Sequence, residues 1–454
     1  MHGQTLGCDD HLNALLTDLY ELNMAASYLR RGMTGTATFS LFVRSLPVAR
    51  GCLIAAGIES CLDHLESFSF EDDDIRYLAE TQGFRPQELE AFRRLRFTGD
   101  VWAIPEGRVA LAGEPILEVT APLPEAQLVE TMLLNLVTFE TTIASKAARC
   151  VIAADGRDLV DFSFRRTQGV EAGVDVARLS CMVGFVATSN VEAARRHGLA
   201  AAGTMAHSYI EAFANEDAAF RAFAEDFPGR ATFLVDTYDT IAGINHAIAV
   251  IKDLGLSGRL GIRIDSGDLA ALAKRGRRLL DRAGLTQVRI FASGGLDELS
   301  IDELVRAGAP IDAFGVGTRM GVSADHPYLD TAYKLVSYAG RPVMKLSRGK
   351  MSAPGRKQVF RRSKPFGDLV GLHDERPPAG LEKVLEPVML GGSRTGARAS
   401  IDDIRARFKA DLDHLPAGAR AIQSPKPPVV RFTDRLRQLT EKTRRRLASQ
   451  GLRT

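Results

Sequence analysis

The chain has 454 residues, so at about 100–200 residues per domain it holds two or three domains, with enough core to fold without disulfide or metal staples. Its 58 basic and 56 acidic residues leave a net charge of +2, which argues against a whole-molecule field for nucleic acid or an anionic membrane. The mean hydropathy is −0.06, and no apolar run approaches the roughly 20 residues that cross a bilayer. With no signal-peptide pattern at the N-terminus, we expect a cytoplasmic enzyme.

The cysteines are odd in number and scattered, and none forms a CxxC pair: Cys8, Cys52, Cys61, Cys150 and Cys181. This pattern disfavours a disulfide framework and a structural zinc site.

Residues 1–125 mix one helical segment with strand-like runs. A helix is expected over Leu15–Leu29, and TATFSLFVRSLP, VWAIPEG and GEPILEV have the character of strands. We therefore predict an α+β domain here. Apolar residues at helical spacing then predict a long, largely buried helix over LVETMLLNLVTFETTIASKAARCVIAA.

Residues 126–330 carry a repeating pattern from about residue 158 onward. Short apolar runs end in polar or glycine-rich clusters: DLVDFSFRR, VGFVATSN, AAGTMAHS, ATFLVDTYDT, LGIRIDSGD, VRIFASGG and IDAFGVGT. Helical stretches separate most of them. Consecutive βα units of this kind predict a parallel sheet, open or closed into a barrel, with its chemistry in the loops after the strands.

After residue 330 the βα pattern stops. Residues 331–425 contain hairpin-like runs, including a Pro-Gly turn, and residues 426–454 form a basic segment with Arg444, Arg445 and Arg446. We interpret this tail as a helix with a solvated charged face.

Two glycine-rich turns follow the last two predicted strands. FASGG contains Gly294 and Gly295, and FGVGT contains Gly317 and Thr318. Glycines at such a place let the backbone approach an anion closely, and a phosphate site built from the last two βα loops is common in barrels. Turns that merely reverse the chain are the alternative.

IRIDSGD brings Arg263, Asp265 and Asp268 together at one strand end. Two carboxylates and a guanidinium are costly to crowd unless they hold a polyol, a metal or a phosphate. The alternative is an aspartate or serine that caps the next helix; Ser266 could do so, but capping leaves Arg263 unexplained.

FSFRRTQG and GTMAHS supply further polar side chains. Arg165 and Arg166, placed on a strand, would point to opposite faces, so that one can capture a carboxylate or phosphate. For Arg166 a surface ion pair is an equal alternative. His207 alone is only a candidate nucleophile or acid/base, with no second histidine placed for a metal pair.

These segments, in this order, resemble nicotinate phosphoribosyltransferase. The resemblance begins with TDLYELNMAASYLRRG and FSLFVRSLP, runs through FSFRRTQG, GFVATSNV, GTMAHS, VDTYDT, IRIDSGDL, FASGGLDE and FGVGT, and closes with KMSAPGRKQVFR. It spans about residues 12–361.

The resemblance implies an irregular, incomplete α/β barrel beside a second α+β domain built from the N-terminal and post-barrel segments. It also implies a homodimer with shared active sites. The implied reaction joins nicotinate to 5-phosphoribosyl-1-pyrophosphate, giving nicotinate mononucleotide and pyrophosphate in NAD salvage. ATP hydrolysis would be coupled through a phosphohistidine, with Mg²⁺ required.

The resemblance also implies residue roles. His207 takes the place of the phosphorylated histidine, with Arg263 and Asp265 as the other catalytic residues. The implied substrate-binding residues are Tyr20, which would stack on the pyridine ring from the partner subunit, and Arg165, Arg166, Ser189, Ser208, Asp268, Gly294, Gly295, Gly317 and Thr318. No protein metal ligand is assigned.

Ser189 bears on the choice between acid and amide. Nicotinamide-using relatives carry an aspartate at the matching place, and an aspartate would repel a carboxylate substrate. Ser189 with Arg165 and Arg166 therefore favours nicotinate.

Three positions depart from the family pattern: Ser163 and Ala187 stand where glycine is usual, and Asn23 stands where threonine is common. Added side chains at Ser163 and Ala187 would narrow the pocket mouth or reshape a turn.

Alternatives from other classes remain. A nicotinamide- or quinolinate-using relative is opposed by Ser189 and by the GTMAHS segment respectively. A catalytically lapsed nucleotide-binding paralogue predicts the loss of a charged motif residue, and none is lost. An unrelated phosphate-binding barrel would not explain TDLY or the doubled arginine. The expected partners are small-molecule substrates, without nucleic acid or membrane.

Overall fold

The computed structural model describes residues 14–347 and 352–449. Cys8, the start of the chain, Lys350 and Met351 of KMSAPGRKQVFR, and the last five residues of the predicted tail lie outside the described residues. The described chain forms two compact units. The first comprises the described parts of residues 1–142, 328–419 and 425–454, and the second comprises residues 143–327 and 420–424. The domain boundaries that the sequence predicts, at residues 125, 330 and 425, stay predictions.

The second unit is built on a six-stranded parallel sheet in the order β7-β6-β11-β10-β9-β8. Its strands are β6 (Asp158–Asp161), β7 (Ala187–Thr188), β8 (Thr232–Leu234), β9 (Gly261–Ile264), β10 (Arg289–Ala292) and β11 (Ala313–Val316). This confirms the parallel sheet of βα units. The AAGTMAHS run differs, since among the described residues it contributes only one bridge, from Thr188 to Ala201, and no strand. Closure into a barrel stays a prediction.

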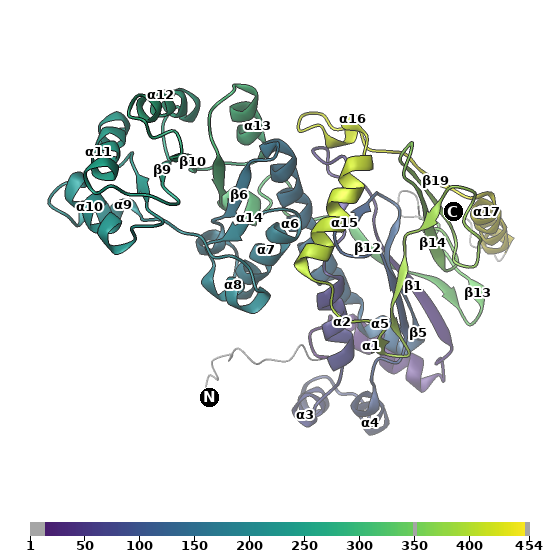
Figure 1. Cartoon of the computed structure of the whole chain (residues 1–454). Helices are drawn as coiled ribbons and strands as arrows, with labels where there is room; N and C mark the ends of the chain where they lie inside the picture. Colours follow the sequence, from purple (N-terminus) through teal and green to yellow (C-terminus); the bar gives the residue numbers. More distant parts are fainter. Residues whose placement is uncertain (1–13, 348–351, 450–454) are drawn as a thin grey trace. The chain divides into compact units, whose positions relative to one another are not determined.

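Helices follow most of these strands. They are η1 (Phe164–Arg166, a 3₁₀ turn), α7 (Val170–Met182), α8 (Val191–His197), α9 (His207–Glu211), α10 (Glu216–Asp226), α11 (Thr240–Asp253), α12 (Leu269–Arg282), α13 (Glu298–Arg306) and α14 (Thr318–Gly321). Figure 1 shows α11 and α12 side by side next to β9 and β10. Gly276 of α12 makes this close packing possible, because a Cβ there would lie 3.2 Å from Ile244 and 3.4 Å from Ile262.

The polar clusters after the strands also begin the helices. Asn190, Asp239, Asp268 and Asp297 each cap a helix, accepting a hydrogen bond from the backbone N–H three residues later. Such caps satisfy otherwise unpaired N–H groups of the first turn. Part of the polar signal at the strand ends is therefore structural.

The first unit contains a seven-stranded sheet in the order β13-β12-β1-β5-β3-β17-β18, with antiparallel neighbours β1–β12, β1–β5 and β3–β5. Its strands are β1 (Thr36–Val43), β3 (Asp100–Ala103), β5 (Pro115–Pro122), β12 (Thr331–Tyr338), β13 (Arg341–Pro342), β17 (Glu386–Leu390) and β18 (Ser393–Arg394). The main core lies against this sheet, with Phe39 stacked on Tyr333 at a centroid distance of 4.7 Å.

The helices of this unit are α1 (Leu19–Arg30), α2 (Ile58–Ser67), α3 (Asp72–Thr81), α4 (Pro86–Arg94), α5 (Leu123–Leu128), α15 (Ile401–His414) and α16 (Ala417–Arg420). The predicted long helix is α6 (Glu130–Ala154), and the division between the units falls within it. No helix in the described ranges is long and apolar enough to cross a membrane.

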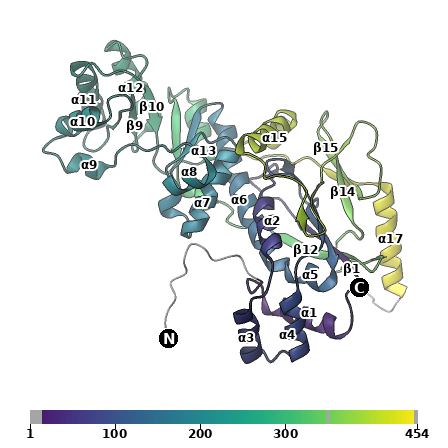
Figure 2. The same ribbon diagram turned by 60° about the horizontal axis from the view of Figure 1, so that its bottom comes forward.

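A smaller sheet, in the order β16-β14-β15-β19, completes the first unit together with the short pair β2 (Leu53–Ile54) and β4 (Val109–Ala110). The smaller sheet's strands are β14 (Lys357–Arg362), β15 (Gly367–Leu372), β16 (Glu382–Lys383) and β19 (Val430–Phe432). Helix α17 (Asp434–Ser449) packs beside β15 (Figure 2), and Leu436 is its fully buried residue. The basic tail is thus helical, and it also contains a strand.

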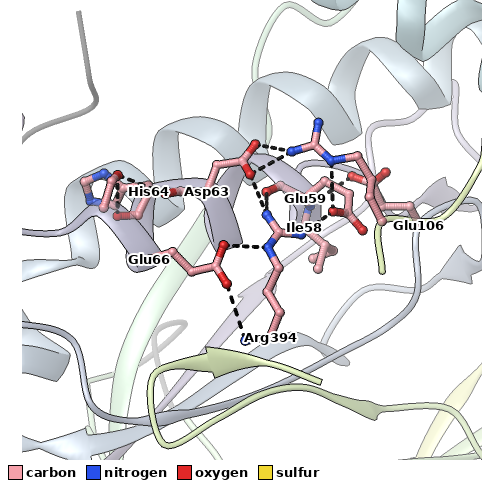
Figure 3. Close-up of polar contacts among 9 residues, drawn as sticks. Ile58, Glu59, Asp63, His64, Glu66, Glu106 and Arg394 are labelled. Carbon is pink, nitrogen blue, oxygen red and sulfur yellow. Dashed lines mark hydrogen bonds and ion pairs between the residues drawn. The ribbon is translucent and has the colours of Figure 1, made fainter. Parts of the chain in front are cut away.

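Arg394 of β18 joins the late part of the chain to α2 (Figure 3). Its guanidinium pairs with Glu59, Asp63 and Glu66, at N–O distances of 2.6, 2.5 and 2.8 Å. At the start of the same helix, Glu106 accepts hydrogen bonds from the backbone N–H groups of residues 57–59. A carboxylate at this end of a helix complements the unpaired N–H groups and the helix dipole.

Candidate active site

The candidate residues of the second unit follow the carboxyl ends of its strands. Because parallel strands place these ends at one edge of a sheet, the segments after β6, β7, β8, β9, β10 and β11 meet there. The loops after the paired strands β9 and β10 are in direct contact, since Ser293 hydrogen-bonds to Asp265.

Arg263 lies at the centre of a hydrogen-bonded cluster. From within β9 its Nη2 donates to Asp265 Oδ1 at 2.6 Å and its Nε donates to Ser293 Oγ at 2.7 Å. Ser293 Oγ in turn donates to Asp265. The guanidinium also lies over the Phe162 ring, 5.4 Å from the centroid. The side chain is 13% exposed, so a largely desolvated cation is held in one orientation.

The Asp265 carboxylate is stabilised in its charged form. Burial alone would raise its pKa, but the hydrogen bonds from Ser293 and Arg263 outweigh burial and hold the pKa below its usual value. The carboxylate therefore stays ionised at neutral pH and available to a substrate hydroxyl or a cation.

His207 is the first residue of α9, and its Nδ1 lies 3.2 Å from Thr237 Oγ1. The neighbouring Asp236 supports the loop after β9, because its Oδ2 accepts from the Asp265 backbone N–H at 2.9 Å and from Ser266 Oγ at 2.6 Å. Its other oxygen, Oδ1, is buried without a hydrogen-bond partner among the described residues.

The glycine turns fit closely against these loops. Gly294 has a φ of +97°, and a Cβ there would lie only 1.9 Å from the Asp265 carbonyl oxygen. Glycine is therefore required at this position. Gly295, with a φ of +64°, faces open space. Gly317 and Thr318 begin the single-turn α14 after β11.

Arg165 and Arg166 were predicted on a strand, and this is wrong. β6 ends at Asp161, and both arginines lie in the 3₁₀ turn η1, where they are exposed. The cause is the buried Asp161 carboxylate, which accepts from the Ser163 backbone N–H at 2.9 Å and from Ser163 Oγ at 2.6 Å and so turns the chain. The two arginines therefore do not point to opposite faces of a strand, as the sequence had predicted.

Asp161 also joins this turn to the next one. Its second oxygen accepts from Thr188 Oγ1 at 2.7 Å, and its carbonyl accepts from the N–H of Ser189, which is exposed after β7. Burial raises the pKa of Asp161, although the hydrogen bonds from Ser163 and Thr188 partly offset this. The turns carrying Arg165 and Ser189 are thus held together by one buried carboxyl group.

Three other predicted site residues lie outside the Arg263 cluster. Asp268, not Ser266, caps α12, with Oδ1 accepting from the Ala271 N–H at 3.0 Å. Ser208 is exposed in α9, next to His207. Tyr20 belongs to the first unit, where its ring is 47% exposed on α1 and burial raises the pKa of its hydroxyl.

Ser163 and Ala187, which stand where the family pattern has glycine, are both buried. Ser163 points at Asp161, and Gly321 makes room for it, because a Cβ on Gly321 would lie 2.3 Å from the Ser163 Cβ. Ser163 therefore reshapes a turn and does not protrude from it. Ala187 lies within β7.

Asp161, Thr188, Asp236, Thr237 and Ser293 are the site residues that sequence reasoning did not single out. Each stands at or directly after a strand end, in DFSF, ATSN, VDTYDT or FASGG. Their position at the strand ends was the feature of the sequence that could have identified them.

A cavity of about 400 Å³ opens beside the cluster, lined in part by Phe162, Phe291 and Thr204. Since Thr204 also accepts from Arg263, the cavity adjoins the cluster.

Comparison with known proteins identifies the family. Residues 15–138 match the nicotinate phosphoribosyltransferase N-terminal domain, residues 158–378 the nicotinate phosphoribosyltransferase family, and residues 377–440 the C-terminal domain. The chain is 47% identical over 418 residues to nicotinate phosphoribosyltransferase pncB2 of Mycobacterium tuberculosis, covering 91% of this chain and 90% of that protein. It is 42% identical over 382 residues to nicotinate phosphoribosyltransferase of Bacillus subtilis, covering 81% and 78%.

The fold is similar to that of a solved relative. The crystal structure of human nicotinic acid phosphoribosyltransferase aligns with a TM-score of 0.83 at 28% identity, covering 94% of this chain and 99% of that one. Three matching domains and relatives of high identity along most of the chain show that it belongs to the nicotinate phosphoribosyltransferase family.

Proposed function

We propose that the protein is an ATP-coupled nicotinate phosphoribosyltransferase of NAD salvage. It would join nicotinate to 5-phosphoribosyl-1-pyrophosphate and release nicotinate mononucleotide and pyrophosphate. The observation that carries the proposal is the Arg263–Asp265–Ser293 cluster, which lies beside His207 and against the Gly294 turn in a member of this family. These groups can hold a ribose and its phosphates.

The reaction needs positioning more than a strong base. As pyrophosphate departs, C1 of the ribose gains cationic character, and the pyridine nitrogen, already free, attacks it. The protein has to align the two reactants and neutralise the departing charge. Arg263 supplies a fixed cation for a phosphate, and the ionised Asp265 can accept from a ribose hydroxyl.

His207 would carry the phosphoryl group from ATP. Its Nδ1 faces the Thr237 hydroxyl, which leaves Nε2 as the nitrogen to attack the γ-phosphorus. The bond from Nε2 to phosphorus forms as ADP leaves, and water later takes the phosphoryl group. Positioning and charge neutralisation are the main demands of such a transfer.

For the base, the turns joined by Asp161 support nicotinate over nicotinamide. Arg165 and Arg166 offer guanidinium groups for a carboxylate, and Ser189 adds no charge that would repel one. Phe162 and Phe291 line the adjoining cavity and offer ring faces to a pyridine. Tyr20 of a partner subunit would stack on that ring in the homodimer with shared active sites that we also propose.

Mg²⁺ would enter with the phosphates of the substrates. No group of three metal-binding side chains occurs in the described parts of the chain, which fits an ion held mainly by substrate oxygens and water. Asp265 and the unpartnered Oδ1 of Asp236 are the carboxylate oxygens that would contribute. Bound there, the ion would neutralise phosphate charge. We place the reaction in the cytoplasm.

A product assay tests the proposal. Phosphoribosyl pyrophosphate and Mg²⁺ are supplied with nicotinate, nicotinamide or quinolinate, each with and without ATP, for the wild type, His207→Ala and the control His414→Ala. We expect the mononucleotide from nicotinate alone and a gain with ATP that only His207→Ala lacks. Radiolabel from γ-labelled ATP should appear on the wild type and on His414→Ala.

The other results have distinct meanings. A preference for nicotinamide would contradict the reading of Ser189, and an unchanged gain with ATP in His207→Ala would remove the phosphohistidine. If no base reacts although the protein binds ATP, the nucleotide-binding paralogue replaces the enzyme.

A further inference from the structure

A cavity of about 360 Å³ opens on the four-stranded sheet of the first unit, and no residue of the candidate active site lines it. It is formed by the β14–β15 hairpin, β19 and the residue before β16, Leu381. Its volume lies at the lower end of the range of about 300–1,000 Å³ for small-molecule pockets. None of the chemistry proposed above uses it.

The strand register explains the hollow. Arg362 of β14 pairs with Gly367 of β15, and Leu369 of β15 pairs with Arg431 of β19. Paired residues share a face, and alternate residues of a strand return to it, so Arg362, Gly367, Leu369 and Arg431 all belong to the same face. Gly367 supplies no side chain there, and a Cβ built on it would meet nothing within 4 Å.

The cavity is positively charged. Arg362 and Arg431 are exposed, and within the described residues neither guanidinium takes part in a hydrogen bond or an ion pair. Two arginines on one face without carboxylate partners repel each other and offer paired donors to an anion. Lys383 pairs with Phe360 on the same face and adds to the positive field.

The acidic residue in the lining does not cancel this charge. Asp368 contributes to the lining, but its carboxylate is buried and accepts from Arg361 Nη2 at 2.7 Å and Nε at 3.1 Å. Arg361 also binds Asp411 at 2.8 Å. Asp368 is therefore neutralised within the protein, on the opposite face of the sheet from Arg362.

The remaining walls are apolar. Phe366, Leu369, Leu381 and Val429 line the cavity, and Val429 is 72% exposed. Phe366 lies at the hairpin turn, and its ring centroid is 5.0 Å from the Arg361 guanidinium, which belongs to the opposite face of the sheet from Arg362. A ligand for the cavity thus needs an anionic end for Arg362 and Arg431 and a planar or apolar body for the other walls.

We propose that this cavity, the β14–β15 pocket, binds a nucleoside monophosphate. The phosphate would accept hydrogen bonds from Arg362 and Arg431, and the base would lie against Leu369, Leu381 and Val429. Phosphate suits the two guanidinium groups because it carries more acceptor oxygens and more charge than a carboxylate. The proposal goes beyond the phosphoribosyl transfer, and it stands or falls independently of that reaction.

Binding of adenosine 5′-monophosphate, ribose 5-phosphate and inorganic phosphate is measured by calorimetry on the full chain. The variants are Arg362→Gln/Arg431→Gln, Gly367→Val and the control Arg76→Gln on α3, where an exposed arginine loses the same charge. Gly367→Val fills the pocket but leaves both arginines, and it lies where a Cβ meets open space. Melting temperatures show that each variant is folded.

We expect one binding site for adenosine 5′-monophosphate to weaken about tenfold or more in both pocket variants and to stay unchanged in Arg76→Gln. Any further site, including the active site, should be unaffected, and product formation without added monophosphate should equal that of the wild type. Unchanged binding in both pocket variants would overturn the proposal. So would equal affinities for the monophosphate and inorganic phosphate, because the apolar walls would then contribute nothing.

Discussion

Glu21 buries a carboxyl group in the first unit, one residue after Tyr20. It is 0% exposed, and its oxygens accept from the hydroxyl groups of Thr17 and Thr131, while Glu130 adds a negative charge nearby. Burial raises the pKa of Glu21 to about 7, although the two hydroxyl groups offset part of that rise. The charged form is therefore the costly one in the folded state.

This raised pKa predicts a dependence of stability on pH. The contribution of Glu21 is fully present below its usual pKa of 4.5 and is lost as the pH rises toward 7. Glu21→Gln removes the ionisation, so we expect its free energy of unfolding, relative to wild type, to rise by about 1–3 kcal/mol between pH 5 and pH 8. Urea unfolding at both pH values measures this. Glu90→Gln, at an exposed ion pair, is the control, and equal pH dependence in all three proteins would contradict the prediction.

At the residue scale, residue types at strand ends predicted that polar side chains gather after the strands, but they did not separate a residue of the candidate cluster from a helix cap. Arg263 and Asp265 do form one cluster, whereas Asp268, in the same motif, caps α12. A capping aspartate and a ligand-binding aspartate have the same sequence signature, since both follow a strand and precede a helix. Asp161 escaped notice because a buried carboxylate inside an apolar run gives no periodic signal.

At the scale of elements, the turn after β10 depends on contact between backbones. Gly294→Ala would force the new Cβ against the Asp265 carbonyl, and the φ of +97° adds strain. We expect the loops after β9 and β10 to separate, with a fall in kcat/KM of about tenfold or more. Gly284→Ala is the control: its φ is +77°, but a Cβ there meets nothing within 4 Å, so it adds backbone strain without a clash.

The two glycine variants separate strain from the clash. Both should lose about 1 kcal/mol of stability from the left-handed conformation, and only Gly294→Ala should lose activity as well. Product assays beside thermal melts decide this. If both variants kept wild-type activity, the close approach of the two loops would be irrelevant to catalysis.

The βα rhythm predicted the parallel sheet because helix and strand periods alternate along the chain. It misplaced two local elements. FSFRR leaves its strand early, where Ser163 bonds to Asp161, and AAGTMAHS, although apolar at its start, forms only one bridge. In the first case a local hydrogen bond between Ser163 and Asp161 turns the chain, and in the second the pairing depends on Thr188 of another segment. The apolar pattern along one segment contains neither.

At the scale of the molecule, the chain visits each unit more than once. Residues 420–424 return to the second unit, where Arg149 Nη2 donates to the Ile422 carbonyl at 2.6 Å and its Nε donates to the buried Glu298 at 3.1 Å. Residues beyond 424 belong to the first unit, where β19 pairs with β15. Short-range sequence patterns do not predict such returns.

This path predicts graded effects of truncation. Ending the chain after Ser424 removes β19 and the buried Leu436 of α17, exposes the edge of β15, and costs about 2–5 kcal/mol of stability. Ending it after Ala419 also leaves Arg149 without its carbonyl acceptors, so the melting temperature should fall further. A chain that ends after Ser449 keeps all these contacts and is the reference for the two shorter chains. If the chain ending after Ser424 melts as the full chain does, then β19 and α17 are surface additions, and the tail contributes only its charge.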